Sequence, residues 1–283
     1  MEIKNIAVIG AGQMGQGIAQ TAAMSGFFVS LADQNLESAQ KGIQKISAQL
    51  DKMVAKQKIT GDEYQGILAN LKAVGGFAEL KSADLVIEAV SENLELKKKI
   101  WQELDREVKK DALFASNTSS ISITTLAATT QRPSQFAGMH FMNPVPIMKL
   151  VEGISGIQTS PEAFATIRKT AEKMGKTFVE VRDMPGFAVN RILMPMINEA
   201  VYVLYEGIAS VADIDTSMKL GTNQPMGPLT LADFIGLDTC LAIMEVLHEG
   251  FGDSKYRPCP LLKQYVTAGW LGKKTGRGFH RYE

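Results

Sequence analysis

Three glycines at the spacing G-x-G-x-x-G are the first residues whose arrangement could do chemistry. Gly10, Gly12 and Gly15 directly follow the apolar run of residues 6–9, and the residues after them have the composition of a helix. A strand, a glycine-rich turn and a helix N-terminus in that order bind the phosphates of a dinucleotide, because the N–H groups and dipole of the helix face the anion. The alternative is a glycine-rich turn without a ligand.

An acidic residue at a suitable distance favours the dinucleotide. A second apolar run, residues 27–31, leads to Asp33, which lies 23 residues after Gly10. This is near the spacing at which a carboxylate binds the ribose 2′-hydroxyl. Because a carboxylate there would repel a 2′-phosphate, we expect NAD as the cofactor rather than NADP.

A histidine and a glutamate form the second candidate group. His140 lies in the apolar run 136–141, and Glu152 follows twelve residues later, after a turn that contains prolines. Two strands joined by such a turn can bring an imidazole and a carboxylate together. The carboxylate would orient the ring and favour the imidazolium, as general acid/base catalysis requires. Beside a nicotinamide this pair would interconvert an alcohol and a ketone. The alternative is a histidine that is simply buried in the core.

Two further polar residues could contact a substrate. Ser119 could hold the reacting hydroxyl, and Asn190 could supply an amide from the second domain, although both residue types are also common structural devices. The chain contains two other histidines. We expect His248 to complement the dipole at the end of a helix and His280 to be exposed.

The elements that must position these residues alternate between strand and helix through about residue 140. This pattern predicts an α/β fold, a doubly wound and largely parallel sheet of the Rossmann type. Ligands of such sheets bind beyond the carboxyl ends of the strands, where Glu92, Asn117, Ser119 and His140 fall. We expect a first domain over residues 1–185, a boundary at the Pro-Gly pair, and a smaller all-helical domain over residues 186–283.

Two predicted helices carry unusual faces. In the helix expected from residue 36 to about 58, four lysines share one face: Lys41, Lys45, Lys52 and Lys56. This is either a solvated face or a basic stripe, without an acid to neutralise it, that receives a phosphorylated substrate. Residues 192–204 are apolar around most of the helix circumference. Because the small second domain has little other core to cover them, we expect a homodimer, which sedimentation at micromolar concentration would reveal.

Composition limits the remaining possibilities. Thirty basic and thirty acidic residues give no net charge, so nothing favours nucleic acid or a membrane surface as partner. The two cysteines lack C-x-x-C spacing, and no disulfide or metal site is expected. No apolar run is long enough to span a membrane, and a strand beginning near residue 3 leaves no room for a signal peptide. We expect a cytoplasmic protein.

The chain also resembles a known family over nearly its whole length. Its motifs resemble, in order, those of the 3-hydroxyacyl-CoA dehydrogenases, and among them the short bacterial 3-hydroxybutyryl-CoA dehydrogenases of butyrate pathways. The block His140-Phe-Met-Asn-Pro144 and the block Pro185-Gly-Phe-Ala-Val-Asn-Arg191 are the most specific. The other matching segments are residues 10–15, 116–120, 149–152, 218–221 and 225–229.

The resemblance implies roles for individual residues. His140 would be the general acid/base, Glu152 its partner, and Ser119 and Asn190 substrate contacts. The CoA of an acyl-CoA substrate would lie along the helix that carries Lys52 and Lys56. The implied cofactor contacts are Gly10, Gly12, Gln13, Met14, Gly15, Asp33, Glu92, Lys97 and Asn117.

Departures from the family pattern are small. Gly153 and Ser155 stand where larger residues are usual, which could alter a loop around Glu152, and His280 stands where a tyrosine is usual. The expected reaction interconverts (S)-3-hydroxybutyryl-CoA and acetoacetyl-CoA, with the stereochemistry implied by the resemblance alone. The alternatives are a dehydrogenase of free 3-hydroxy acids or sugar acids on the same scaffold, and a non-catalytic dinucleotide-binding or crystallin-like relative.

Overall fold

The chain divides into two compact units. A computed structural model describes residues 1–282, and the units meet between Met184 and Pro185. The first unit contains all eight strands of one sheet, and the second consists of helices and short turns. Each unit has its own hydrophobic core.

The sheet of the first unit has the strand order β3-β2-β1-β4-β5-β6-β7-β8. All neighbouring strands are parallel except β6 and β7. The prediction of a doubly wound, largely parallel sheet is therefore confirmed. The strands are β1 (Asn5–Ile9), β2 (Phe28–Ala32), β3 (Leu71–Val74), β4 (Leu85–Glu88), β5 (Leu113–Ser116), β6 (Phe136–Phe141), β7 (Leu150–Ser155) and β8 (Thr177–Arg182).

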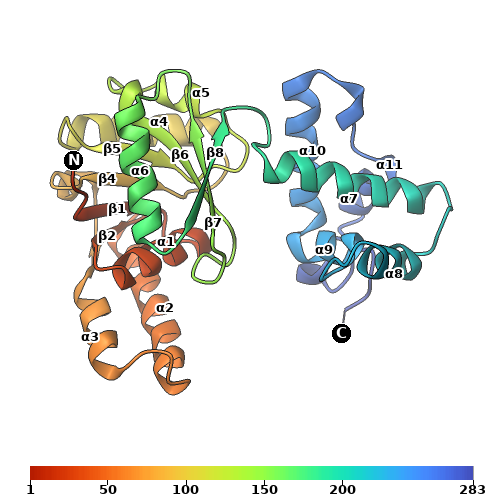
Figure 1. The fold of residues 1–283 in the computed structure, drawn as a ribbon, viewed down its shortest axis with the longest axis horizontal. Helices are drawn as coiled ribbons and strands as arrows, with labels where there is room; N and C mark the ends of the chain where they lie inside the picture. Colours follow the sequence, from red (N-terminus) through yellow and green to blue (C-terminus); the bar gives the residue numbers. More distant parts are fainter. Residues whose placement is uncertain (283) are drawn as a thin grey trace. The chain divides into compact units, whose positions relative to one another are not determined.

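Helices lie on both faces of this sheet, with α6 over one face and α4 over the other (Figure 1). On the α4 face the Trp101 ring packs on Phe114 and Phe136, with centroids 4.9 and 4.6 Å away. On the α6 face Phe164 packs on Phe178. The helices are α1 (Gln13–Met24), α2 (Leu36–Ala55), α3 (Gly61–Ala69), α4 (Leu94–Glu107), α5 (Ile123–Ala127) and α6 (Pro161–Lys173), with single 3₁₀ turns at Phe77–Leu80 and Pro133–Gln135.

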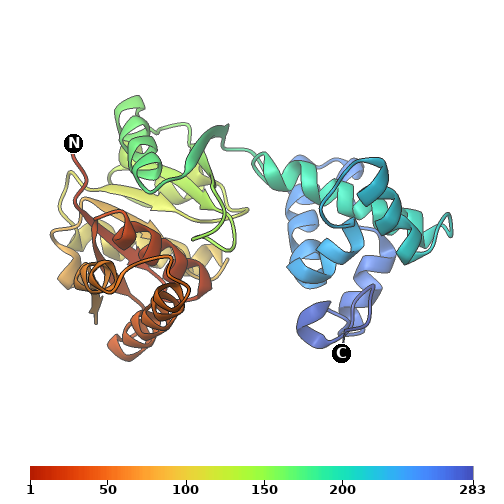
Figure 2. The same cartoon turned by 60° about the horizontal axis from the view of Figure 1, so that its bottom comes forward.

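Helices α2 and α3 form a pair that extends beyond the sheet (Figure 2). Asn35 begins α2 by accepting a hydrogen bond from the Ser38 amide, and Thr60 begins α3 through a capping box with Glu63. The buried side of α2 includes Ile46 and Leu50, which leaves its lysine-bearing side exposed.

The one antiparallel pairing in the sheet is the hairpin of β6 and β7. Its register places His140 directly opposite Glu152. Strand β7 runs from Leu150 to Ser155, so Gly153 and Ser155 belong to a strand and not to a loop. The expectation that they alter a loop around Glu152 is therefore wrong.

Gly153 makes room for an aromatic ring from the neighbouring strand. A Cβ atom at this position would lie 1.8 Å from Cζ of Phe178. The ring of Phe178 occupies the space that a side chain at residue 153 would fill, so a small residue here is a packing requirement of the β7–β8 pair.

The second unit packs five helices around its own core. They are α7 (Val189–Tyr205), α8 (Val211–Gly221), α9 (Pro228–Ile235), α10 (Leu237–Phe251) and α11 (Pro260–Thr267), with 3₁₀ turns at Ser254–Tyr256 and Lys273–Thr275. Helices α9 and α10 are separate because Gly236 between them adopts φ +102°.

The second unit covers more of α7 than expected. Met194, Ile197 and Val201 are buried in its core, which corrects the expectation that little core would be available. Ile192 on the same helix remains 72 % exposed. The apolar circumference of α7 is thus explained in large part by packing within the unit.

His280 is not the exposed residue that we expected. Its Nε2 atom lies 2.9 Å from Oδ2 of Asp215, and its side chain is only 31 % exposed. Asp233, which is buried, accepts hydrogen bonds from the amides of Phe279 and His280 and from the Tyr282 hydroxyl. The two carboxylates therefore hold the C-terminal segment against α8 and α9.

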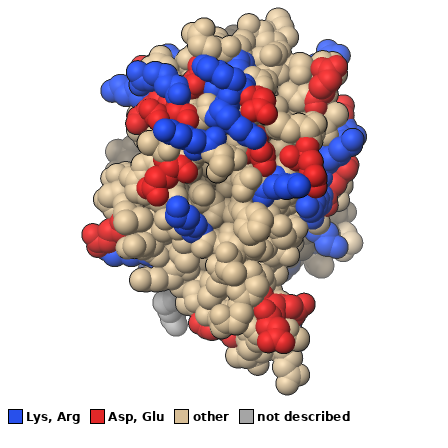
Figure 3. All heavy atoms as spheres, turned by 90° about the vertical axis from the view of Figure 1, so that its left-hand side faces the viewer, with Lys and Arg blue, Asp and Glu red and all other residues tan. Residues whose placement is uncertain are grey.

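Acidic and basic side chains alternate over the face of the molecule drawn in Figure 3, without a large region of one sign. This distribution agrees with the balanced composition. Within residues 1–282, none of the helices is both long and apolar enough to cross a membrane.

We predict that the Gly153→Ala substitution destabilises the first unit. The added methyl group must displace the Phe178 ring, and overpacking of this kind costs about 1–3 kcal/mol. The urea midpoint of unfolding, followed by circular dichroism, should fall accordingly. Gly66→Ala is a matched control, because a Cβ there meets no atom within 4 Å. It should keep or raise the midpoint, and equal midpoints for both variants would contradict the prediction.

Candidate active site

The glycine-rich turn between β1 and α1 is as tight as its sequence suggests. Gly10 has φ +100°, and a Cβ on it would lie 2.7 Å from the Ala89 carbonyl oxygen. A Cβ on Gly15 would lie 1.7 Å from the carbonyl oxygen of Gly10. By contrast, nothing lies within 4 Å of the Cβ position of Gly12. Two glycines therefore allow close packing, and the third leaves open space at the start of α1.

The start of α1 presents backbone donors at this open space. Gly12 is the N-cap residue, and Gln13 and Met14 are the first two residues of the helix. N–H groups in the first turn of a helix lack an intrahelical partner, and the helix dipole makes this end positive. The turn is suited to a phosphate group in both respects.

Asp33 lies at the same edge of the sheet, after β2. Its Oδ2 atom accepts a hydrogen bond of 2.5 Å from the Ala11 amide, and its Oδ1 atom one of 2.7 Å from the Gln34 amide. The side chain is thus held beside the glycine-rich turn by two backbone donors.

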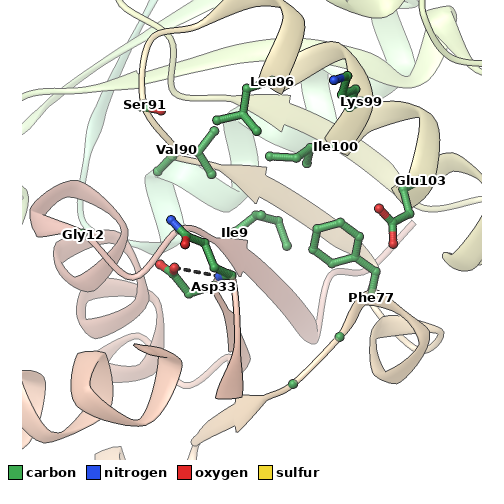
Figure 4. A pocket seen from close by; sticks show the side chains of 15 residues that line it. Ile9, Gly12, Asp33, Phe77, Val90, Ser91, Leu96, Lys99, Ile100 and Glu103 are labelled. Atoms are coloured by element: carbon green, nitrogen blue, oxygen red, sulfur yellow. Dashed lines mark hydrogen bonds between the residues drawn. The ribbon is translucent and has the colours of Figure 1, made fainter. Parts of the chain in front are cut away.

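A cavity of about 640 Å³ opens at the carboxyl ends of β1 to β4 (Figure 4). Leu96 and Ile100 of α4 line one side and Phe77 another, with Ile9 and Val90 at its base. Its charged lining residues are Asp33, Lys99 and Glu103. The mostly apolar walls and a few polar groups are typical of a ligand site.

Sequence reasoning found only part of this cavity. Of the predicted cofactor residues, Gly10, Gly12 and Asp33 line it, whereas Gln13, Met14 and Gly15 belong to the adjoining first turn of α1. The residues that it missed include Phe77, Leu96 and Ile100. The signal available for them was weak: Gly75 and Gly76 follow a strand, and two apolar residues four apart face one side of α4.

The loop that carries Ser119 is held by one carboxylate. Oε1 of Glu92 accepts hydrogen bonds from the Thr118 hydroxyl and from the amides of Ser119 and Ser120, at 2.5, 2.8 and 3.0 Å. Burial would raise the pKa of Glu92, but the Lys97 ammonium and these hydrogen bonds outweigh it and lower the pKa. Glu92 therefore stays ionised and fixes the loop.

Lys97 supports Glu92 from inside the protein. The lysine is 1 % exposed, and its Nζ atom lies 2.6 Å from Oε1 of Glu88 and 3.3 Å from Oε2 of Glu92. Glu88 also accepts a hydrogen bond from the Ser116 hydroxyl at the end of β5. This burial favours a role in holding Glu92, and a direct cofactor contact by Lys97 stays a prediction.

Asn117 and the histidine–glutamate pair complete this part of the first unit. Oδ1 of Asn117 accepts a 2.8 Å hydrogen bond from the amide of Phe141, the residue after His140. Nδ1 of His140 lies 2.8 Å from Oε2 of Glu152, and both side chains are buried. The expected contact between imidazole and carboxylate is therefore present. A carboxylate at Nδ1 favours the form of the ring that carries a proton on this nitrogen.

The remaining candidates belong to other elements. Asn190 is buried in the first turn of α7, in the second unit. Lys52 and Lys56 are exposed near the end of α2. Lys41 forms an ion pair of 2.6 Å with Glu37 one turn away, so the expectation that no acid neutralises the stripe is wrong for this lysine.

The residues present fit a dinucleotide. The open Cβ position of Gly12, the donors of the first turn of α1 and the adjacent cavity provide space for phosphates and for an apolar ring system. For residues 1–282, no group of three or more histidine, cysteine, aspartate or glutamate side chains is arranged to hold a metal ion.

Comparison with known proteins identifies the family. The sequence profile described as "3-hydroxyacyl-CoA dehydrogenase, NAD binding domain" matches residues 5–184, and the one described as "3-hydroxyacyl-CoA dehydrogenase, C-terminal domain" matches residues 186–282. The chain is 57 % identical to a probable 3-hydroxybutyryl-CoA dehydrogenase of Bacillus subtilis, over 100 % of this chain and 99 % of that protein. It is 54 % identical to a 3-hydroxybutyryl-CoA dehydrogenase of Bradyrhizobium diazoefficiens, over 99 % and 96 %.

Solved structures agree with the sequence comparison. The crystal structure of (S)-3-hydroxybutyryl-CoA dehydrogenase from Ralstonia eutropha superimposes with a TM-score of 0.98 at 50 % identity, covering all of both chains. The resemblance drawn from the motifs is thereby confirmed. The chain belongs to the 3-hydroxyacyl-CoA dehydrogenase family and is an enzyme that uses a nicotinamide dinucleotide.

Proposed function

We propose that this enzyme interconverts (S)-3-hydroxybutyryl-CoA and acetoacetyl-CoA, with NAD as its cofactor. The observation that carries the proposal is the buried pair of His140 and Glu152, 2.8 Å apart, in a chain of this family. The names of the relatives from Bacillus subtilis and Ralstonia eutropha support the substrate. The stereochemistry rests on the same likeness.

His140 is the proposed general acid/base. When bound, the nicotinamide takes up or supplies the hydride. In oxidation, Nε2 of His140 accepts the hydroxyl proton of the substrate, and the carboxylate of Glu152 stabilises the resulting imidazolium through Nδ1. In reduction, the imidazolium returns this proton to the oxygen and stabilises the negative charge that develops there.

Ser119 and Asn190 are the proposed substrate contacts. Ser119 lies in the loop after β5, where Glu92 holds its amide. Its hydroxyl would hold the reacting oxygen in line with His140. Asn190 would donate a hydrogen bond from its side-chain amide to the same substrate. For Asn190 the support is its match to the family motif at residues 185–191.

The preference for NAD over NADP is proposed from the charge beside the ribose site. Asp33 stands at the position expected for a carboxylate that binds the 2′-hydroxyl, and Glu103 adds a second negative charge to the cavity lining. Lys99 is its single basic lining residue. A 2′-phosphate would therefore meet repulsion from Asp33. The cofactor roles of Glu92, Lys97 and Asn117 remain part of the proposal.

The CoA part of the substrate is proposed to bind along α2. Lys52 and Lys56 are one turn apart and exposed, and no acidic side chain forms an ion pair with either in the described part of the chain. Their ammonium groups would attract the phosphates of CoA. Lys45 shares this face, whereas Lys41 already forms an ion pair with Glu37.

The proposal also includes a homodimeric assembly and a location in the cytoplasm. Exposed apolar side chains in the second unit, among them Ile192, Leu220 and Phe234, support a homodimer. Both cysteines, Cys240 and Cys259, are free and buried, and burial raises the pKa of the Cys240 thiol to about 12. Unpaired, unreactive thiols are typical of proteins in the reducing cytoplasm.

A spectrophotometric assay tests the function. Acetoacetyl-CoA should oxidise NADH, with loss of absorbance at 340 nm, and kcat/KM should be at least about tenfold higher with NADH than with NADPH because of Asp33. Free acetoacetate should be a poor substrate. Turnover of the free acid but not of the CoA ester would overturn the substrate, and equal rates with NADPH would overturn the role of Asp33.

Replacement of the proposed base tests the mechanism. His140→Gln keeps a similar size but cannot exchange the proton, so kcat should fall by about 10²–10⁴-fold. The dissociation constant for NADH, measured by fluorescence, should change little. His248→Gln is the matched control on α10 and should keep the wild-type rate. A fully active His140→Gln enzyme would leave the mechanism without its base.

Removal of the two lysines tests the CoA site. The double variant Lys52→Ala/Lys56→Ala should raise KM for acetoacetyl-CoA by about tenfold and leave kcat largely unchanged, because the lost contacts are the same in the ground and transition states. Lys41→Ala, on the same helix but paired with Glu37, should leave KM unchanged. An unaltered KM in the double variant would count against this surface.

A further inference from the structure

The loop between β6 and β7 controls the geometry of the proposed catalytic pair. It spans residues 142–149 and joins the strand that carries His140 to the strand that carries Glu152. In an antiparallel hairpin the loop sets the register, and a shift of one residue would turn one partner to the opposite face of the sheet. A contact that fixes this loop therefore also maintains the hydrogen bond between Nδ1 of His140 and the carboxylate of Glu152.

One face of the loop lies on α1. Val145 is 2 % exposed, and a Cβ on Gly17 of α1 would lie 2.8 Å from Cβ of Val145. In addition, Nε2 of Gln13 donates a hydrogen bond of 3.2 Å to Oδ1 of Asn143. The loop thus touches the helix that begins at the glycine-rich turn, and Figure 1 shows it beside α1.

A buried lysine reaches the loop from another element. Lys176 lies in the turn between α6 and β8 and is 8 % exposed. Its Nζ atom donates hydrogen bonds of 2.5 Å to the Val145 carbonyl and 2.9 Å to the Met148 carbonyl. Within residues 1–282 no carboxylate forms an ion pair with this ammonium group. Its hydrogen-bond acceptors are therefore backbone oxygens of the loop.

A buried ammonium is costly, and burial lowers the pKa of Lys176. A hydrogen bond from a charged donor is stronger than one from a neutral donor, and an ammonium can donate three. The Lys176 side chain therefore links two carbonyl groups of the loop that lie three residues apart. A methyl-terminated side chain of similar length would fill the space and make neither bond.

We propose that Lys176 is a positioning residue for His140 and Glu152. It fixes residues 145–148 against α1, so that the register of the hairpin and the contact between Nδ1 and the carboxylate are maintained. Lys176 itself touches neither substrate nor cofactor in this scheme. The inference rests on the proposed function for its effect on the rate, but its effect on His140 can be measured independently.

The test compares three variants. Lys176→Met removes both hydrogen bonds, and Lys176→Gln keeps a neutral donor. Lys169→Met is the matched control, an exposed lysine on α6 for which the structure gives no ion pair in the described residues. Each variant is assayed with acetoacetyl-CoA and NADH well below its melting temperature, and each is labelled with ¹⁵N-histidine for NMR.

Two changes are expected together. In Lys176→Met, kcat should fall by about tenfold or more, because a small misplacement of a catalytic group is costly, while KM for NADH stays within about twofold. The hydrogen-bonded Nδ1–H signal of His140 should shift or broaden. Lys176→Gln should be intermediate, and Lys169→Met should match the wild type. If Lys176→Met does not fold, Lys176→Gln decides the question by the same criteria.

A failure of the positioning role and a failure of the proposed function give different results. An unchanged His140 signal in Lys176→Met, or a wild-type kcat, overturns the positioning role, and a lowered melting temperature alone would indicate a purely structural lysine. If the wild-type enzyme does not turn over acetoacetyl-CoA, the proposed function fails instead. The NMR comparison still reports in that case whether Lys176 holds His140 on Glu152.

Discussion

The hydrogen bond between His140 and Glu152 depends on the single antiparallel pairing in the sheet. Parallel neighbours need a long crossover, whereas an antiparallel pair can be joined by a short loop. Strands β6 and β7 therefore bring two residues only twelve positions apart into direct opposition, at 2.8 Å. Both side chains are buried, so breaking this hydrogen bond would cost free energy. The loop that joins the two strands is packed against α1.

Much of this arrangement could be predicted from sequence because it depends on local patterns. Apolar runs marked the strands, and residues after the strand ends marked the ligand edge. The antiparallel turn was signalled by the prolines between His140 and Glu152. The likeness to the 3-hydroxyacyl-CoA dehydrogenases suggested roles for Ser119 and Asn190, and these roles stay predictions. The inferences from the apolar runs and from the proline-containing turn require knowledge of a few neighbouring residues only.

What could not be predicted depends on distant partners. The sequence around Lys97 and Lys176 carries no local signal of burial, yet both lysines are buried, and their partners come from other elements. His280 was expected at the surface, and its contact with Asp215, 65 residues away in the chain, left no local signal in the sequence. Gly153 was interpreted as a loop variant, although the reason for the glycine is the ring of Phe178 on the next strand. Burial and pairing at long range are properties of the assembled fold.

Carboxylates provide hydrogen-bond acceptors for the loops at the ligand edge. A loop there has backbone N–H groups without strand partners, and each needs an acceptor. A carboxylate has four lone-pair positions, so one side chain can satisfy several donors. Glu92 does this for residues 118–120, and Asp183 does it for the amides of Ile123 and Thr124. Lys176 is the complementary case, in which one cation satisfies two loop carbonyls. In the first unit, the loop that carries Ser119 and the loop that joins His140 to Glu152 are therefore each held by a charged side chain from another element, Glu92 for the first and the buried Lys176 for the second.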